Sequence, residues 1–387
     1  MTDNEERRKV NAVSEFLQRS CQMRSPLRLN FAQIARRITY PTLNPVDGHQ
    51  CKASLQSSGS AAEFYIETMF SCVDDVDVMY HYSDEIAVPA WYRPPSRLPT
   101  DFEDRVRVYE IVNCQQPGFV FLNLTYILSR NAHDSKYVVA EYVNSANTAL
   151  SHGHYATIDN NYKIKVKIHG PAYIFGAEPD TLYTSIGHSG MLDSDSVPCI
   201  HCFEWPPQAF DWPKRYRNSG WPNSATVDRV VGQGCDVVGV AHRQNKEDKW
   251  MSQHQWRLSF SQAEVVLLNS WMPVQQIVYH LLRVFVKTER LTGRSDNNSG
   301  ADTLSNYHIK TLMLWACEMK PRHRWNDGSS LISKCLQMLQ FLEEWLTKKQ
   351  GQHYFINNAH FLDCFDQVTV VAVSALVSSI TEDRLAQ

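Results

Sequence analysis

A short alternating stretch, residues 73–80, constrains the fold of this chain most. Val76 and Val78 fall on one side of the alternation, and Asp75 and Asp77 fall on the other. A period of two predicts a β-strand with one apolar face and one acidic face. Two carboxylates on one face of a strand are the hard oxygen ligands that Mg²⁺ prefers. The sequence therefore predicts a strand that can bind a divalent cation.

A glycine-serine loop precedes this strand. Ser58, Gly59 and Ser60 end a stretch of loop-forming residues, 41–60. Glycine lets backbone amides approach a triphosphate, and a serine hydroxyl adds a donor. Each feature alone is common, because most such acid pairs are solvated and most Gly-Ser pairs lie in ordinary loops. The order of loop, short helix or turn, and acidic strand favours phosphoryl transfer.

A third carboxylate is needed for two-metal phosphoryl transfer, and it has to come from a neighbouring strand. Asp195 precedes Val197 and Ile200 in another short predicted strand. We therefore expect Asp195 to complete the acidic set, with Asp193 as the alternative.

The rest of the chain divides into a strand-rich part and a helical part. Further strands are predicted at 109–122, 137–142, 162–175 and 195–200, followed by an irregular segment at 205–221. Helices are predicted at 4–37 with a break near Ser25 and Pro26, and at 261–269, 273–290, 306–319, 331–348 and 358–379. A flexible polar loop is expected at 292–303. We expect two units, 1–250 and 251–387.

Composition limits where such a protein works and what it binds. A chain of 387 residues with 43% hydrophobic residues is typical of a folded protein of two lobes. The ten scattered cysteines and the polar N-terminus predict a reducing, cytoplasmic location. The most apolar stretch, 368–380, is short for a bilayer and predicts a buried helix, so no membrane partner is expected.

The charge distribution bears on nucleic-acid binding. A net charge of −3 excludes a general attraction to polyanions, so any such surface has to be local. Residues 1–40 carry eight basic residues against four acidic ones. We expect Arg19, Arg24 and Arg28 to lie on a helix that contacts an activating ligand, and a solvated helix face is the alternative.

Four motifs in a fixed order resemble a known family. They are GSAAEFYIETMFSCVDDVDVMY, SVPCIHCFEWPP, WRLSFSQAE and SNYHIKTLMLWACE, between residue 59 and about residue 320. They resemble the Mab-twenty-one-like proteins and, among them, the cyclic GMP-AMP synthase-like receptors of animals. The resemblance implies an α+β, bilobed nucleotidyltransferase fold, with a mixed β-sheet lobe, a long N-terminal spine helix and a C-terminal helical-bundle lobe.

The resemblance also implies a function. It is that of an innate immune sensor, activated by a ligand that is usually double-stranded nucleic acid. The active enzyme joins two nucleoside triphosphates, such as ATP and GTP, into a cyclic dinucleotide such as cGAMP. A separate receptor, STING, reads the product.

Matched residue by residue, the resemblance assigns two sets of site residues. The nucleotide-binding set is Ser58, Gly59, Ser60, Arg257, Ser259, Ser261, Glu264, Asn306 and Tyr307. The catalytic and metal-binding set is Asp75, Asp77 and Asp195, which would ligate two Mg²⁺ or Mn²⁺ ions. In the family the serine-tipped loop holds the donor triphosphate, and the tyrosine stacks on a base.

Departures from the vertebrate enzyme change the expected ligand. Residues 269–276, NSWMPVQQ, contain no cysteine where the vertebrate DNA sensor has a zinc-binding insert. No structural zinc is expected there, and Cys199, His201 and Cys202 lack two further ligands at metal spacing. Double-stranded RNA is therefore the expected activator, recognised by shape and backbone charge. The resemblance implies a basic residue of the acceptor pocket in the next helix, and its position falls near Tyr279 here. Which bases the enzyme joins therefore stays open.

Several alternatives stay open. A catalytically silent interaction protein of the same fold is the second hypothesis, although it has no chemical reason to keep three acidic residues. A template-free polymerase of the oligoadenylate type, which gives linear products, is the third. Without the resemblance, Arg257 and Tyr307 are packing or surface residues in helical surroundings. Lys310 is a nucleotide contact or a solvent-exposed helix residue, and His308 is a core histidine rather than a base.

Overall fold

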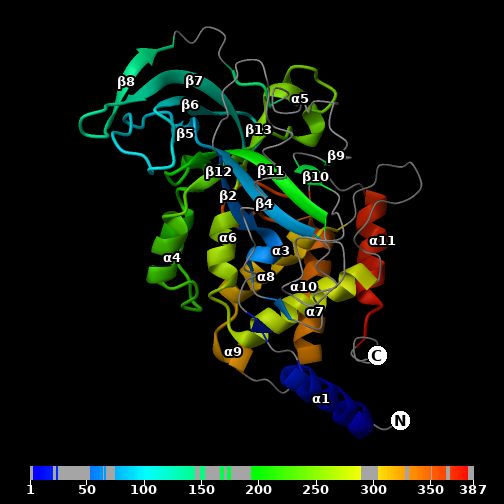
Figure 1. Cartoon of the computed structure of the whole chain (residues 1–387). Coiled ribbons are helices and arrows are strands. Elements are labelled where there is room, and N and C mark those ends of the chain that lie inside the picture. The colour runs from blue at the N-terminus through cyan, green and yellow to red at the C-terminus, as the bar shows by residue number, and fades with distance from the viewer. Residues whose placement is uncertain are drawn as a thin grey trace.

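The computed structural model of the protein has a large β-sheet at one end and a group of helices at the other (Figure 1). It describes residues 3–20, 23–24, 53–63, 65–66, 75–143, 149–152, 166–169, 172–175, 193–288, 304–326, 331–349, 351–362 and 367–381. The predicted α+β class is confirmed by this arrangement.

The main sheet is mixed, and its strands follow the order β2-β4-β11-β12-β13-β7-β6-β5. Their bounds are Ala53–Ser58 (β2), Asp75–Tyr82 (β4), Glu85–Pro89 (β5), Arg105–Asn113 (β6), Phe119–Arg130 (β7), Asp193–Cys202 (β11), Cys235–Val238 (β12) and Trp256–Ser259 (β13). Beside this path, β8 (Tyr137–Tyr142) pairs with β7, and β10 (Ala172–Phe175) joins β11 to β9 (Val166–His169). A separate pair joins β1 (Met23–Arg24) to β3 (Tyr65–Ile66). The strands β4 and β11 run parallel, which places their N-terminal ends side by side.

Most of the helices lie below the sheet in Figure 1, whereas α5 lies at the top of the view near β13. Their bounds are Asp3–Ser20 (α1), Gly59–Ala62 (α3), Ser224–Val231 (α4), Met251–His254 (α5), Ser261–Leu268 (α6), Pro273–Thr288 (α7), Asn306–Met319 (α8), His323–Asn326 (α9), Leu331–Lys348 (α10) and Gln367–Ser378 (α11). Helices α7, α8, α10 and α11 pack on one another, and α6 contacts β2 and β12. Helix α6 therefore links the two ends of the molecule.

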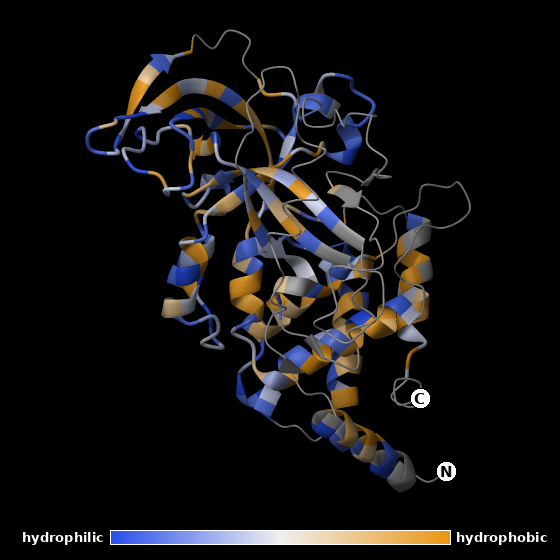
Figure 2. Ribbon diagram, viewed as in Figure 1, coloured by the Kyte–Doolittle hydropathy of each residue, from blue (hydrophilic) through white to orange (hydrophobic). Residues whose placement is uncertain are grey.

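The alternation of the sequence decides which side chains are buried. On β6, Val106 and Val108 are buried while Arg105 and Arg107 are exposed. The same banding of apolar and polar residues follows the strands and helices in Figure 2. One face of a strand such as β6 can therefore pack while the other reaches solvent.

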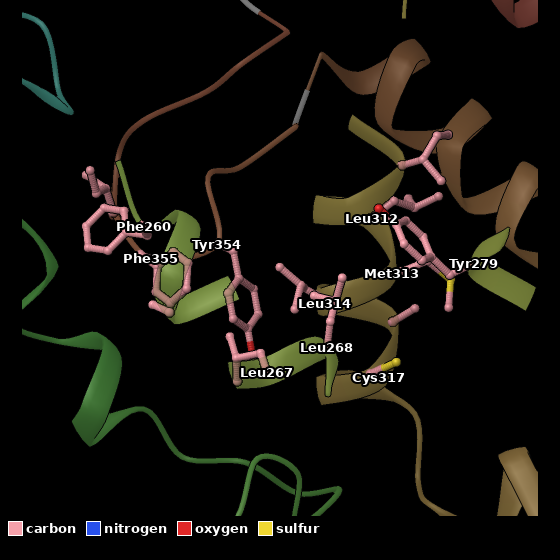
Figure 3. Close-up of a cluster of buried hydrophobic side chains, with 14 of the residues drawn as sticks. Phe260, Leu267, Leu268, Tyr279, Leu312, Met313, Leu314, Cys317, Tyr354 and Phe355 are labelled. Carbon is pink, nitrogen blue, oxygen red and sulfur yellow. The ribbon is translucent and has the colours of Figure 1, made fainter. Parts of the chain in front are cut away.

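A continuous core joins the sheet to the helices. Phe260, which follows β13, stacks on Phe355 with ring centroids 4.6 Å apart. Leu267 of α6 and Leu314 of α8 are fully buried beside them (Figure 3). Because this core holds α6 and α8, it also fixes the residues that these helices present toward the sheet.

Several predicted elements are confirmed. The predicted strands at 137–142 and 195–200 are β8 and part of β11, and the acidic strand is β4. The helices predicted at 306–319 and 331–348 have the same bounds as α8 and α10. The segment 205–221 is irregular, as expected, apart from two short 3-10 turns.

Other predicted bounds were wrong. The single strand predicted at 109–122 is two strands, because β6 ends at Asn113 and a turn through Gly118, with φ +83°, starts β7. The helix predicted from Asn358 begins at Gln367, and Asn358 itself has a positive φ of 63°. The predicted flexible loop at 292–303 lies outside the described residues.

The N-terminal helix is shorter than predicted. α1 ends at Ser20, and Met23–Arg24 is a strand rather than a continuation of the helix. α1 contacts α10 and lies at the end of the molecule far from the sheet (Figure 1). Beyond Arg24 the rest of the predicted helix lies outside the described residues.

The most apolar predicted stretch, 368–380, belongs to α11 and the residues after it. Val370, Val373, Val377 and Ile380 are buried, which confirms the prediction of a buried helix. Within the described part of the chain, no helix combines the length and apolar character that crossing a bilayer requires.

Candidate functional site

Four aspartates lie at the N-terminal ends of two adjacent parallel strands. Asp77 of β4 is the ladder partner of Asp195 of β11, and Asp75 is the partner of Asp193. Ladder partners in a parallel pair project their side chains to the same face, from strands about 4.8 Å apart. Asp77 and Asp195 are both half-buried. The structure thus brings the acidic residues that we predicted from separate parts of the chain to one edge of the sheet.

The glycine-serine loop closes against this edge. Ser58 ends β2 opposite Asp77, and Gly59 and Ser60 begin α3. Gly59 has a φ of +58°, and a Cβ built on it would lie 1.8 Å from Oδ2 of Asp77. Glycine is therefore required twice, for its backbone conformation and for the approach of the loop to the carboxylate.

Two hydrogen bonds hold this loop from the side of α6. Gln262 Nε2 donates to the Ser57 carbonyl at 3.0 Å, and Asn269 Nδ2 donates to the Ala62 carbonyl at 3.4 Å. Gln262 belongs to α6, and Asn269 caps its C-terminal end; α6 itself comes shortly after the WRLS strand β13. The two predicted nucleotide-binding motifs are thus in direct contact.

Ser261, the first residue of α6, has an unusual hydroxyl. Its Oγ is buried and has no hydrogen-bond partner among the described residues. Since buried hydroxyls are nearly always paired, this one is suited to a partner from a bound ligand. Ser259, two residues earlier on β13, is half-buried.

A buried ion-pair cluster of three residues joins the loop to the helices. Lys310 Nζ of α8 lies 2.7 Å from Glu63 Oε1, directly after α3, and 3.1 Å from Glu264 Oε2 of α6. Burial alone would lower the pKa of Lys310, but the two carboxylates raise it well above its ordinary value. Lys310 is therefore a charged, buried residue, and the alternative of a solvent-exposed helix residue was wrong.

Glu264 and Glu63 are also buried. The sequence did not lead us to predict Glu63 as a residue of the site. Burial raises the pKa of Glu264, and Lys310 opposes that shift. An acid next to a Gly-Ser loop carries no sequence signal of its own, because its partner is 247 residues away in α8.

Arg257 and Tyr307 lie near this cluster. Arg257 is an exposed residue of the strand β13, so the expectation of helical surroundings was wrong for it. It interacts electrostatically with Tyr307 and Glu264. Tyr307, half-buried on α8, contacts the rings of His353 and Phe361. These contacts bring Arg257 and Tyr307, two residues of the predicted nucleotide-binding set, into one region of the molecule.

The start of α8 holds two more residues considered in the sequence. Asn306 is exposed at the first position of the helix. His308 accepts a hydrogen bond from the Ser305 amide at Nδ1, 2.9 Å away, and burial lowers its pKa to about 4. His308 is therefore a helix-capping residue that stays neutral at pH 7.

Tyr279 of α7 is a core residue. It is fully buried against Trp271 and is labelled within the cluster in Figure 3. Burial raises its pKa to about 12. The guanidinium of Arg283, one turn later, lies 5.5 Å from the centre of its ring. Of the arginine and lysine residues of this helix, Arg283 is thus the nearest to the expected position.

The three arginines predicted as a ligand surface do not share one helix. Arg19 is exposed on α1 and pairs with Glu15 at 3.4 Å. Arg24 belongs to the strand β1, so its placement on the helix was wrong. Arg28 lies outside the described residues.

Comparisons with known proteins identify the family. Residues 99–270 match the Mab-21 protein nucleotidyltransferase domain, and residues 275–379 match the Mab-21 protein HhH/H2TH-like domain. The first match includes Asp195 and the WRLSFSQAE motif and begins after Gly59 and Asp77.

Named relatives agree with these matches. The chain is 24% identical over 176 residues to "Protein mab-21-like 3" of Danio rerio, covering 44% of this chain and 40% of that protein. It is 29% identical over 185 residues to "Protein mab-21-like" of Aedes aegypti, covering 46% of each. It is 27% identical over 166 residues to "Protein mab-21-like" of Drosophila melanogaster, covering 41% of this chain and 42% of that protein. The chain spans less than half the length of these relatives.

The two domain matches follow one another along the chain. On this evidence the chain belongs to the Mab-21 family, with a nucleotidyltransferase domain followed by a helical C-terminal domain.

Proposed function

We propose that this protein is a ligand-activated nucleotidyltransferase that makes a cyclic dinucleotide from two nucleoside triphosphates. The observation that carries the proposal is the pairing of Asp77 with Asp195 on parallel strands, with the Gly59 loop closed against Asp77. A set of carboxylates beside a glycine turn is what two-metal phosphoryl transfer requires.

The donor set fits hard divalent cations. Carboxylate oxygens are the ligands of Mg²⁺ and Mn²⁺, and neighbouring carboxylates repel one another unless a cation compensates them. Asp75, Asp77 and Asp195 would hold the two ions. When bound, these ions lower the pKa of the attacking hydroxyl and neutralise charge on the phosphate.

The remaining roles fall to the protein's own groups. The amides around Gly59 and Ser60 and the hydroxyl of Ser58 would bind the donor triphosphate. Asp195 would accept the proton of the attacking hydroxyl.

On the side of β13 and α6, the proposal gives the acceptor nucleotide to Arg257, Ser259 and Ser261, with Glu264 near the triphosphate. The unpaired buried hydroxyl of Ser261 supports this assignment, since a nucleotide oxygen or amine would satisfy it. Tyr307, with Asn306 beside it, would stack on a base, a contact worth roughly 1–3 kcal/mol.

In this proposal double-stranded RNA is the activator and STING the receptor of the product. Both parts come from the family resemblance. Exposed Arg8, Lys9 and Arg19 on α1 offer a local basic surface on a chain whose net charge is −3. Such a surface suits recognition of a phosphate backbone.

The test is mass analysis of the products of a defined reaction. Purified protein receives Mg²⁺ or Mn²⁺ and all four nucleoside triphosphates, alone, with double-stranded RNA or with double-stranded DNA. Asp77→Asn is the inactive variant, and Asp228→Asn, an exposed residue of α4, is the matched control. We expect a cyclic dinucleotide with RNA from the native protein and from Asp228→Asn alone.

Each other outcome selects another function. Linear products indicate the template-free polymerase. Product without any nucleic acid, or only with DNA, rejects the RNA-activated form. No product above the level of Asp77→Asn under any condition rejects catalysis and leaves an interaction protein of this fold.

A further inference from the structure

A second cluster of side chains lies at the other end of β4 and β11. Nε2 of His81 lies 2.9 Å from Oδ1 of Asp236, and Nδ1 of His201 lies 2.8 Å from the same oxygen. The two imidazole rings meet edge to face, with centroids 5.2 Å apart. The side chains of His81, His201 and Asp236 are 8%, 17% and 2% exposed.

Three adjacent strands of the sheet hold this cluster. His81 belongs to β4, His201 to β11 and Asp236 to β12, and His201 and Asp236 are ladder partners. Each ligand therefore has a rigid strand behind it rather than a loop. Such a preformed set avoids most of the ordering cost that a flexible site has to overcome.

The cluster is separate from the acidic edge, although both lie on the same face. Along β4 the acidic Asp77 and His81 are four residues apart, and along β11 Asp195 and His201 are six apart, so the alternation keeps each pair on one side. An apolar group stands between them, formed by Met79, Cys199 and Val238 with Val197 packed against it. The two clusters cannot share one ion across this barrier.

The buried carboxylate of Asp236 lies between the two imidazole rings. Among the described residues its hydrogen-bond and ion-pair partners are the two histidines. A negative charge in the interior is costly unless it is compensated. A bound cation would compensate that charge directly.

We infer that His81, His201 and Asp236 form a binding site for one transition-metal ion, with Zn²⁺ as the best match. The three ligand atoms lie within 4.8 Å of one another, which a single ion can bridge. Two imidazoles and one carboxylate favour Zn²⁺ and its neighbours over Mg²⁺, which prefers oxygen ligands. Three protein ligands leave the remaining position of a tetrahedral ion to water.

Binding requires a defined change in the two histidines. His81 Nε2 and His201 Nδ1 face the carboxylate of Asp236, and because a carboxylate only accepts hydrogen bonds, these two nitrogens donate to it when no metal is bound. In the metal-bound form these two nitrogens use their lone pairs, so the protons move through solvent to the other nitrogen of each ring. No group is oxidised or reduced. The ion would join β4, β11 and β12, and thereby stabilise the strands that carry the acidic edge.

The sequence could not reveal this site. His201 was considered only with Cys199 and Cys202, which are its neighbours in the sequence. Its partners in the structure lie 120 residues before it and 35 after it. The absence of the family's zinc-binding insert therefore says nothing about this position.

The test uses variants that keep the hydrogen bonds and remove the imidazoles. In His81→Gln the amide nitrogen can replace Nε2, and in His201→Asn it can replace Nδ1, so each variant can still donate to Asp236. Protein freed of metal by a chelator is titrated with Zn²⁺ and with Co²⁺. Stoichiometry comes from elemental analysis, coordination from the visible spectrum of the Co²⁺ form, and stability from the thermal midpoint.

We expect native protein to bind one Zn²⁺, with a higher thermal midpoint and a low-symmetry Co²⁺ spectrum. His81→Gln and His201→Asn should each lower Zn²⁺ affinity at least tenfold and abolish the spectrum. Asp77→Asn and His133→Asn, an exposed histidine, should bind as the native protein does. No bound ion in the native protein, or unchanged binding by both folded histidine variants, overturns the inference. Loss of binding in Asp77→Asn with retention in His81→Gln would assign the ion to the acidic edge and also overturns it.

Discussion

The two sides of the candidate site compensate their charges differently. On the sheet side, Asp77 and Asp195 are adjacent acids that remain half-buried. On the helical side, Glu63 and Glu264 are buried and share the ammonium group of Lys310. Carboxylates that share a buried ammonium group stabilise the fold, whereas adjacent carboxylates at the ends of two strands are suited to a divalent cation. The acidic residues of the sheet side should therefore govern activity, and the buried ion pairs of the helical side should govern stability.

The largest expected effect is on the sheet side. Asp195→Asn should lower dinucleotide synthesis on the order of 10²–10³-fold, the usual cost of one charge-stabilising group in an active site. Its free energy of unfolding should change much less than that of a variant that breaks the buried ion pairs, because the amide keeps the shape of the side chain and its hydrogen-bonding oxygen. Initial rates and urea unfolding measure the two effects.

Asp193→Asn is the matched variant for this prediction, since Asp193 lies two residues away and pairs with Asp75. If Asp193→Asn loses activity and Asp195→Asn keeps it, the third carboxylate is Asp193. Destabilisation of Asp195→Asn by several kcal/mol would remove the contrast between the two sides.

The helical side should show the opposite pattern. Lys310→Met leaves two buried carboxylates without their cation, so the free energy of unfolding should fall by about 3–5 kcal/mol. Lys348→Met, which removes an exposed pair with Glu344, should cost at most about 0.5 kcal/mol. Urea unfolding of both variants checks this. Equal, small effects would show that the buried cluster does not hold the lobes together.

Gly59→Ala tests the contact between the loop and the acidic edge. The new methyl group would collide with Oδ2 of Asp77 and would also strain a backbone with φ +58°. We expect a loss of activity of roughly 10–100-fold, since a displacement near 1 Å has that cost in an active site.

Gly220→Ala separates the two causes. Gly220 has a similar φ of +71°, but nothing lies within 4 Å of its added Cβ. It should show only the strain, about 1 kcal/mol in the free energy of unfolding, and keep full activity. If both variants lose activity alike, the clash with Asp77 is not the cause.

Periodicity predicted those elements whose burial is one-sided. α10 has such a pattern, and its bounds were predicted correctly, as were those of β8 and of the more fully buried α8. β12 was missed because all four of its residues, Cys235–Val238, are buried and show no alternation. β2 was missed because its serine-rich stretch resembles a loop. Local patterns thus predict strands that have one solvent-exposed face, but they do not predict strands that are fully buried or strongly polar.

Long-range pairings depend on register, which no local pattern contains. Asp77 and Asp195 could be proposed as partners only because the chemistry needs a third acid. Lys310 with Glu63 had no such guide, so a buried ion pair was read as a solvent-exposed residue or a ligand contact. The same limit explains why His81 and Asp236 were not associated with His201.

The smallest expected effect concerns pH and the helical side. Nδ1 of His353 accepts hydrogen bonds from the amides of Phe355 and Ile356, both at 3.1 Å, so the ring has to be neutral at that nitrogen. Burial, aided by Arg257 and Arg215, lowers its pKa to about 3. The unfolded chain binds a proton there near pH 6.5 and the folded chain does not, so stability is fully present above that pH and is lost as the pH falls below it.

His353→Asn keeps an oxygen acceptor in this turn and does not titrate. Between pH 7.5 and pH 5, the native protein should lose about 1–2 kcal/mol more unfolding free energy than the variant does. Urea unfolding at both pH values gives this difference. An equal loss in the two proteins would show that protonation of His353 does not lower the free energy of unfolding. The helical side would then be no more sensitive to acid than the acidic strand ends.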